Sequence, residues 1–266
     1  MSVFFYIVVF LLGISLGSFV NMTIYRVAVK YGLEKENKKV GDKKRSYCDY
    51  CGRQLRWYEN IPVVSWLIQG GKSRCCYKKL SVLYPIVELT GGLLLVLVFW
   101  RFNLFLDFFS WVFLVKSVFV FLVITLLIFV FFFDLKYMII PDFSVVSLVL
   151  VALIGVVFDE PNIVPYLLSG IGAMAFLYLL YLITKKRGMG FGDVKFALFM
   201  GLFLGWPKIG VAMYLAFVLG AFFGFVGMLL RKVGRKSKIP FGPFLIVGLL
   251  LAWLWGNELI HLVLKI

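Results

Sequence analysis

Two aspartates stand out as candidate catalytic groups, because each lies at the end of a long apolar segment. Asp193 follows Gly190-Phe191-Gly192 at the start of one such segment, and Asp134 follows a run of apolar residues, rich in phenylalanine, at the end of another. A carboxylate at membrane depth costs about 2.5–3.5 kcal/mol on insertion scales, so an acid in such a place is by default a functional residue with a partner to be found.

The chemistry of these two acids depends on their coming together. Two carboxylates within a few ångström cannot both ionise cheaply, and they therefore share a proton. One can take a proton from a water molecule while the other protonates a peptide carbonyl oxygen, which hydrolyses the peptide without a covalent intermediate. We expect Gly190 and Gly192 to adopt unusual backbone dihedrals and to let a substrate strand approach closely.

Structural alternatives exist for each acid. Asp193 could be a helix N-cap in a glycine turn, and Asp134 an interfacial carboxylate paired with Lys136 or a neighbouring lysine. Asp142, directly after a proline, is expected to cap the next helix. Glu88 lies about two turns inside an apolar segment, where it either binds a substrate group or pairs with a buried donor.

The composition shows what must position these acids. The chain has 266 residues, of which 62% are hydrophobic and 15% charged, and this excludes a soluble domain with a polar surface. Because one span needs about 20 apolar residues, we predict an all-α polytopic membrane protein with about eight transmembrane helices. The predicted spans cover residues 3–27, 82–100, 108–133, 143–158, 164–184, 194–205, 209–230 and 241–262.

The polar residues concentrate in one stretch, which suggests a division of the chain. We predict a first transmembrane helix in residues 1–28, a cysteine-containing loop domain in residues 29–81 and a membrane core in residues 82–266. The first segment lacks a basic start and a small-residue cleavage site, so it is expected to be a retained span.

The net charge of +15 predicts topology rather than nucleic-acid binding. Lysine and arginine gather in the loops that would face the cytoplasm, as the positive-inside rule requires. This places the N-terminus outside and the cysteine loop inside, with anionic membrane lipid as a partner. Asp134 and Asp193 then lie on the same, cytoplasmic side at similar depth.

All four cysteines, Cys48, Cys51, Cys75 and Cys76, fall in the cysteine loop. In a reducing compartment such a group favours a metal over disulfides, and Cys48-x2-Cys51 is half of a zinc-ribbon pattern. Three interpretations remain open: structural zinc bound by all four thiolates, a weak site with three thiolates, or no metal. Adjacent cysteines such as Cys75 and Cys76 can both bind one ion only with some backbone distortion.

Several blocks of sequence, in order along nearly the whole chain, resemble the type IV prepilin peptidase family, a group of intramembrane aspartic proteases with a GxGD motif. The blocks are Gly17-Ser18-Phe19-Val20-Asn21-Met22-Thr23-Ile24-Tyr25-Arg26, Asn60-Ile61-Pro62-Val63-Val64-Ser65-Trp66, Tyr84-Pro85-Ile86-Val87-Glu88, Asp134 to Asp142, Gly190-Phe191-Gly192-Asp193-Val194-Lys195 and Ile239-Pro240-Phe241-Gly242-Pro243-Phe244.

The resemblance implies that Asp134 and Asp193 form the catalytic dyad of an endopeptidase in the bacterial inner membrane. Its substrates would be prepilins or pseudopilins, cleaved at the cytoplasmic face after a glycine and before an aromatic or other apolar residue. A proton- or ion-coupled transporter using Asp134, Asp193 and Glu88 as a relay is the alternative, and a non-catalytic membrane scaffold is a third. Residues expected to position substrate or backbone are Gly190, Gly192, Lys195 and Glu88.

A second activity is implied by the resemblance alone. Many members of the family also N-methylate the new N-terminus with S-adenosylmethionine, an activity associated with the cysteine loop and here with Gly71 and Lys72. The family pattern has its third cysteine where this chain has Ser73, and a hydroxyl is a poor zinc ligand. The chain has no glycine-rich nucleotide-binding unit of the strand–helix kind.

Overall fold

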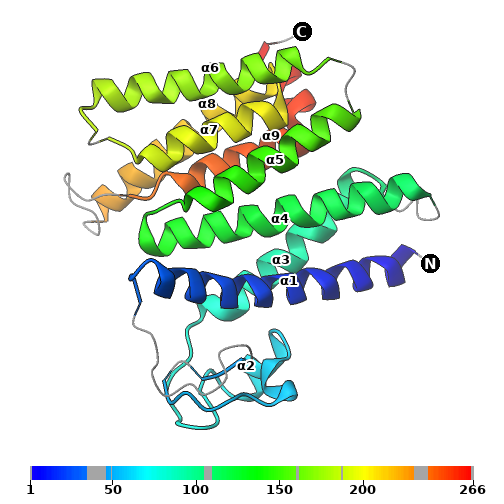
Figure 1. The fold of residues 1–266 in the computed structure, drawn as a ribbon, viewed down its shortest axis with the longest axis vertical. Coiled ribbons are helices and arrows are strands. Elements are labelled where there is room, and N and C mark those ends of the chain that lie inside the picture. Colours follow the sequence, from blue (N-terminus) through cyan, green and yellow to red (C-terminus); the bar gives the residue numbers. More distant parts are fainter. Residues whose placement is uncertain are drawn as a thin grey trace. The chain divides into compact units, whose positions relative to one another are not determined.

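The computed structural model describes residues 2–34, 46–48, 50–104, 110–159, 162–186, 188–230 and 239–264. Within these ranges the chain is helical, and β-structure is limited to two isolated bridges. The chain divides into two compact units, Met1–Phe129 and Val130–Ile266. We describe each unit by itself, with the helix labels of Figure 1.

The first unit is built on two helices that pack closely through glycine. A Cβ on Gly17 of the first helix would lie 2.5 Å from the Cα of Glu88, and a Cβ on Gly91 would lie 2.4 Å from the carbonyl oxygen of Gly13. Small residues at such contacts let membrane helices approach backbone to backbone. The elements are α1 (Ser2–Lys30), η1 (Trp57–Asn60), α2 (Val64–Ile68), α3 (Leu83–Arg101) and the first part of α4 (Trp111–Tyr137).

The second unit surrounds one short helix. Helix α7 packs against α5, α6, α8 and α9, and its side chains Phe196, Phe199 and Met200 are fully buried. A Cβ on Gly201 of α7 would lie 2.4 Å from the backbone of Ser169 in α6. Besides the end of α4, the elements are α5 (Asp142–Asp159), α6 (Val164–Ile183), α7 (Phe191–Leu204), α8 (Lys208–Leu229) and α9 (Gly242–Leu264).

The predicted fold class is confirmed, since a helix occupies each of the eight predicted spans. Six of the described helices, α1, α3, α4, α6, α8 and α9, are long and apolar enough to cross a membrane. Helix α7 has 14 residues, a length of about 21 Å, which is less than the hydrocarbon thickness of about 30 Å. It ends at Gly205, whose φ of 67° lies in the left-handed region.

The predicted orientation and the predicted boundaries at residues 28 and 81 stay predictions. Much of the basic charge behind the orientation lies in residues 35–45, 187 and 231–238, outside the described part of the chain. Large apolar side chains on the helices are exposed, including Phe4 of α1, Leu168 of α6 and Phe225 of α8. Large exposed apolar surfaces of this kind are typical of a protein whose surface contacts lipid.

Candidate active site and cysteine cluster

Asp134 lies in the last turn of α4 and is only 4% exposed. Its Oδ2 accepts a hydrogen bond of 3.0 Å from the backbone N–H of Gly242, the first residue of α9. A Cβ on Gly242 would lie 2.6 Å from that oxygen, so only glycine fits without displacing the carboxylate. The positive end of a helix dipole and an N–H donor therefore meet this acid.

Asp193 lies in the first turn of α7 and is 5% exposed. Its Oδ2 accepts a hydrogen bond of 3.0 Å from the N–H of Gly190, and its own N–H donates to the Gly190 carbonyl at 3.2 Å. The side chain thus satisfies one of the unpaired donors at a helix start, as the acidic residue of a capping box does. The N-cap of α7 is Gly190 and not Asp193, and Asp193 binds the N–H of this N-cap through one of its two carboxylate oxygens.

The segment between α4 and α5 brings the surroundings of the two acids together. Helix α4 ends at Tyr137, and the next residue, Met138, has φ 55° and donates its N–H to the carbonyl of Asp134. Ile140 then lies close to Gly192 of α7 and to Gly242 of α9. A Cβ on Gly192 would lie 3.0 Å from Ile140 Cβ, and one on Gly242 3.3 Å from Ile140 Cδ1. The carboxylates of Asp134 and Asp193 also interact electrostatically.

The prediction of unusual dihedrals at the GxGD glycines is wrong. Gly190 has φ −77° and ψ 149°, which is ordinary extended backbone, and Gly192 is part of α7. The predicted approach of a substrate strand stays a prediction, and a Cβ on Gly192 would press on Ile140 of this chain. The sequence pattern therefore reflects tight packing beside the acid rather than a strained turn.

Lys195 and Asp142 form an ion pair between α7 and α5, with 2.8 Å between Nζ and Oδ1. The Lys195 ammonium also lies 5.1 Å from the centre of the Phe191 ring. Asp142 is the first residue inside α5 rather than the N-cap expected before the helix, and its carboxylate is engaged by this lysine. Lys195 thus holds the start of α7 to the start of α5, which is a positioning contact.

Glu88, in the first unit, pairs with a buried donor. It is 7% exposed, and its Oε2 accepts a hydrogen bond of 2.6 Å from the N–H of Val63. Val63 has φ 62° and ψ −54°, and Val64 N–H donates to Pro62 C=O. This is a γ-turn of the rare strained kind, here with a β-branched residue at its centre. The sequence did not predict Val63 as the donor to Glu88. The one feature that pointed to a turn there is the proline before it, Pro62.

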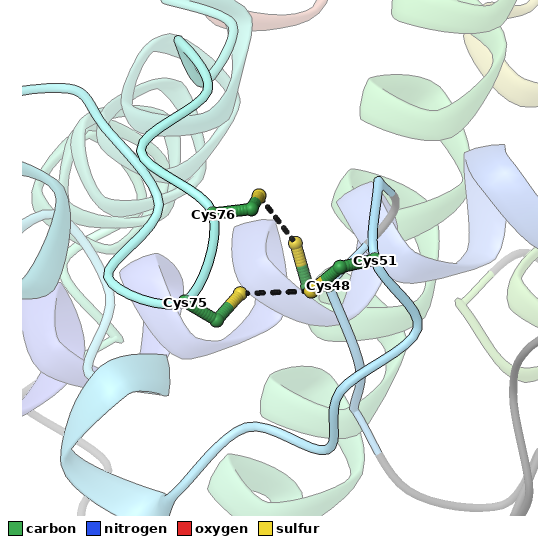
Figure 2. Close-up of side chains that lie close together, drawn as sticks. All are labelled: Cys48, Cys51, Cys75 and Cys76. Carbon is green, nitrogen blue, oxygen red and sulfur yellow. Dashed lines mark hydrogen bonds between the residues drawn. The ribbon is translucent and has the colours of Figure 1, made fainter.

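The four cysteine thiols gather in one place (Figure 2). The Sγ atoms of Cys48, Cys51, Cys75 and Cys76 all lie within 4.8 Å of one another. The shortest contacts are 3.1 Å between Cys51 and Cys75 and 3.8 Å between Cys48 and Cys76. A group of soft thiolate donors at this spacing can bind a metal ion.

The cluster is built from two similar turns. In the first, Gly52 N–H donates to Cys48 C=O, and in the second, Tyr77 N–H donates to Ser73 C=O. Gly52 has φ 76° and Tyr77 has φ 57°. Ser73 therefore occupies the place in the second turn that Cys48 has in the first. The distortion predicted for adjacent metal-binding cysteines stays a prediction, because the positive φ of Tyr77 is shared by Gly52 in a turn without adjacent cysteines.

Ser73 faces the thiols although it is not one of them. It is 4% exposed, and its Oγ lies 3.3 Å from Cys48 Sγ and 3.0 Å from Cys75 Sγ. Burial raises the pKa of Cys48, but contacts with Ser73 and with the backbone of Cys51 and Tyr50 outweigh burial and lower this pKa to about 7. Burial and the neighbouring thiols raise the pKa of Cys75 to about 12.

Gly71 and Lys72 lead into the second turn. Gly71 has φ 68°, and a Cβ there would lie 3.0 Å from Cζ2 of the Trp66 ring. Lys72 pairs with Lys79 in an isolated bridge, and its ammonium-bearing side chain is exposed. These two residues shape the loop beside Trp66.

Two family models match the chain. Residues 11–102 match the bacterial peptidase A24 N-terminal domain, and residues 121–225 match the type IV leader peptidase family. No solved structure matches the chain. The first match covers α1, the cysteine loop and α3, and the second includes both Asp134 and Asp193.

Curated relatives match over nearly the full length. A prepilin leader peptidase/N-methyltransferase of Stutzerimonas stutzeri is 31% identical over 93% of this chain and 90% of the relative. Proteins of the same name from Legionella pneumophila and Pseudomonas aeruginosa are 29% and 30% identical, over 97% and 94% of this chain and 94% and 90% of those relatives. With this identity over almost its whole length, the chain belongs to the type IV leader peptidase family.

Proposed function

We propose that this protein is an aspartic endopeptidase that removes the leader peptide of prepilins or pseudopilins, with Asp134 and Asp193 as its catalytic dyad. The observation that carries the proposal is the pair of buried carboxylates in the second unit, each fixed by the N–H of a glycine and interacting electrostatically with the other. The orientation predicted from loop charge puts the reaction at the cytoplasmic face of the inner membrane.

The hydrogen bonds leave the right atoms available for hydrolysis. In the described part of the chain, each carboxylate has one donor, which binds Oδ2. The remaining oxygens can hold a water molecule between the two acids. One aspartate takes a proton from the water as its oxygen attacks the peptide carbon, and the protonated aspartate donates its proton to the carbonyl oxygen. Collapse of the diol then returns a proton to the departing amine.

The test is cleavage of a prepilin by purified protein in detergent. Asp134→Ala and Asp193→Ala should each abolish leader loss, because neither carboxylate can act as both acid and base. Asp142→Ala is the milder comparison, because it breaks the ion pair with Lys195 but leaves both acids in place, and it should lower the activity only in part. Undiminished cleavage by either dyad variant would refute the assignment. No cleavage of any pilin by the wild type would favour a transporter or a scaffold.

We further infer that the cysteine cluster binds a structural zinc ion through Cys48, Cys51, Cys75 and Cys76. The donor set supports this, because zinc prefers four thiolate or imidazole ligands. Bound there, the ion would tie the two turns together, and the Ser73 hydroxyl would orient the thiolates of Cys48 and Cys75. Metal analysis of the purified chain should give about one zinc per chain, and a ratio near zero would remove the site.

Ser73→Cys sharpens this test. The variant places a thiol at the position in the second turn that corresponds to Cys48 in the first turn. Cys48, Cys51, the new thiol at position 73 and Cys76 can then bind zinc without Cys75. We expect zinc to resist a competing chelator about 10-fold better than in the wild type, by the scale of effects at metal sites. Cys75→Ala in the Ser73→Cys background is the control, and it should keep that gain. A loss of zinc from the double variant would show that Cys75 is an essential ligand.

The printed names of the relatives also include N-methyltransferase activity. We propose that this chain uses S-adenosylmethionine to methylate the N-terminus that cleavage creates, in the region of Gly71 and Lys72. Methylation adds one CH₂, about 14 Da by composition, to the mature pilin. Mass spectrometry of pilin treated with the protein, with and without S-adenosylmethionine, tests this. An unchanged mass after complete cleavage would reject the second activity.

A further inference from the structure

The first unit contains a cavity that the peptidase chemistry does not use. It has a volume of about 160 Å³ and lies between α1, the cysteine loop and the start of α3. Four aromatic residues from these three segments line it, together with a carboxylate at its α3 side. These lining residues are Tyr25, Tyr47, Trp66, Tyr84 and Glu88.

The size of the cavity limits what it can hold. An apolar cavity of about 150 Å³ accommodates a benzene molecule. A cavity of about 160 Å³ therefore accommodates one side chain of about that size. The cavity is partly open, so the rest of a longer ligand would extend out of it.

One carboxylate of the cavity has only neutral partners among the described residues. Two carboxylates line the cavity, and Glu59 is already neutralised by Arg53 at 3.0 Å. Glu88 differs, because its partners in the described chain are the neutral donors Val63 N–H, Ser18 and Asn21. A buried carboxylate is costly unless a positive charge accompanies it. Arg26 also lines the cavity and is engaged by a partner of its own.

One lining residue offers an unused donor. The Nε1 of Trp66 is buried and has no acceptor among the described residues. Such an orphaned group is rare in native proteins and calls for an explanation, such as a ligand. The Trp66 ring is held against Gly71, where a Cβ would lie 3.0 Å from Cζ2. This nitrogen has almost no accessible surface, so a carbonyl oxygen in the cavity would satisfy the donor only after a small shift of the ring.

We propose that this cavity binds the N-terminal residue of a peptide that has a free α-ammonium group and an apolar side chain. The ammonium would pair with Glu88, the first peptide carbonyl would accept from Trp66, and the side chain would lie among the tyrosines. A positive charge beside aromatic faces gains cation–π attraction as well. The inference rests on the proposed function, since cleavage before an apolar residue produces such an N-terminus, and it identifies the cavity as the acceptor site for methylation.

The test compares two peptides for binding to the full-length protein in detergent. One is a short peptide with N-terminal phenylalanine, and the other is its N-acetylated form, which lacks the positive charge. We expect the free peptide to bind at least about 10-fold more tightly, the size of a charge-assisted hydrogen bond. Equal affinity of the two peptides, or no binding of either, would overturn the proposal.

Two variants test which side chains cause the preference for the free peptide over the acetylated peptide. Glu88→Gln keeps an acceptor for Val63 N–H but removes the charge, so it should abolish the preference for the free ammonium. Trp66→Phe removes the Nε1 donor while keeping a ring, so it should weaken both peptides about equally. A preference that persists in Glu88→Gln would refute the ammonium site. Because the readout is a ratio of two affinities in one protein, a general loss of structure would not imitate it.

Two further measurements show whether the bound cation is the peptide ammonium or S-adenosylmethionine, and whether this inference fails separately from the peptidase assignment. S-adenosylmethionine also carries a positive charge, and it should bind without displacing the phenylalanine peptide. Displacement by competition would make this the donor site and overturn the assignment. Prepilin cleavage is measured on the same preparation. Cleavage without selective peptide binding would reject this inference alone, and selective binding without cleavage would reject the peptidase assignment alone.

Discussion

The two units of this protein both bury carboxylates, but they surround them differently. In the second unit, Asp134 and Asp193 each receive one hydrogen bond in the described chain, from a glycine N–H at 3.0 Å. In the first unit, Glu59 is paired with Arg53, and Glu88 receives bonds from Val63, Ser18 and Asn21. The two aspartates therefore have few donors and repel each other, whereas Glu88 has several neutral donors.

This difference distinguishes a reactive site from an anchoring one. Carboxylate oxygens without protein donors are free to exchange protons with water, and two acids with a shared proton can supply both catalytic roles. A carboxylate with several donors instead fixes the groups that bind it. Glu88 fixes the strained turn at Val63, and so it holds the cysteine loop to α3.

The largest effect should follow from moving one carboxylate of the pair. In Gly242→Ala the new Cβ would lie 2.6 Å from Asp134 Oδ2, so the acid must shift while its N–H donor remains. A displacement near 1 Å costs about 100-fold in rate, and prepilin cleavage should fall by that amount. Gly190→Ala is the matched change, because its Cβ would lie 3.4 Å from Asp193 Oδ2.

We expect Gly190→Ala to cost only a few-fold, about 1 kcal/mol or less, because an ordinary contact forms without displacing the acid. Its φ of −77° suits alanine. Cleavage rates at saturating prepilin are the measurement for both variants. Equal losses in the two variants would mean that the glycine spacing does not set the geometry of the pair.

The sequence indicated much of this architecture but not the groups that complete each site. Apolar length predicted the eight long apolar helices within a few residues, because span length follows from bilayer thickness, but it did not predict the short α2 and η1 of the loop. The cost of a carboxylate identified Asp134, Asp193 and Glu88. Their partners, Gly242 and Val63, come from distant segments, and backbone donors carry no side-chain pattern. Only folding shows which N–H faces which acid.

The second prediction tests the anchoring role of Glu88. Glu88→Ala leaves the buried Val63 N–H without its acceptor, which costs about 1–3 kcal/mol, and the strained turn should relax. Glu88→Gln keeps a neutral acceptor at the same reach and should cost less. Cys48 is 4% exposed, so the rate at which a thiol reagent labels Cys48 reports opening of the cysteine loop. Labelling should accelerate most in Glu88→Ala.

A labelling rate in Glu88→Ala that matches the wild type would contradict the anchoring role. Unfolding of the whole chain, followed by circular dichroism, is the control. It should change less than labelling does, since the loss is local to the first unit. Comparable changes in both would mean that Glu88 supports the packing of α1 on α3 rather than the loop.

The smallest effect concerns backbone strain in the two cysteine turns. Gly52 and Tyr77 end these turns with φ of 76° and 57°, a conformation that costs an L-residue about 1–2 kcal/mol. Gly52→Ala should therefore open the loop more often, and Tyr77→Gly should open it less often. The gain from Tyr77→Gly is limited to about 1 kcal/mol, because glycine also adds freedom to the unfolded chain.

If Gly52→Ala speeds Cys48 labelling and Tyr77→Gly slows it, backbone strain is the cause of loop opening. Tyr77 is 79% exposed, so little packing is lost with its ring, and Tyr77→Ala, which keeps the strain, should leave Cys48 labelling nearly unchanged. If Tyr77→Gly and Tyr77→Ala behave alike, the ring and not the backbone matters. If Tyr77→Gly alone slows labelling, the second turn stores strain that the first turn avoids through glycine, and the thiol cluster is what holds that strain in place.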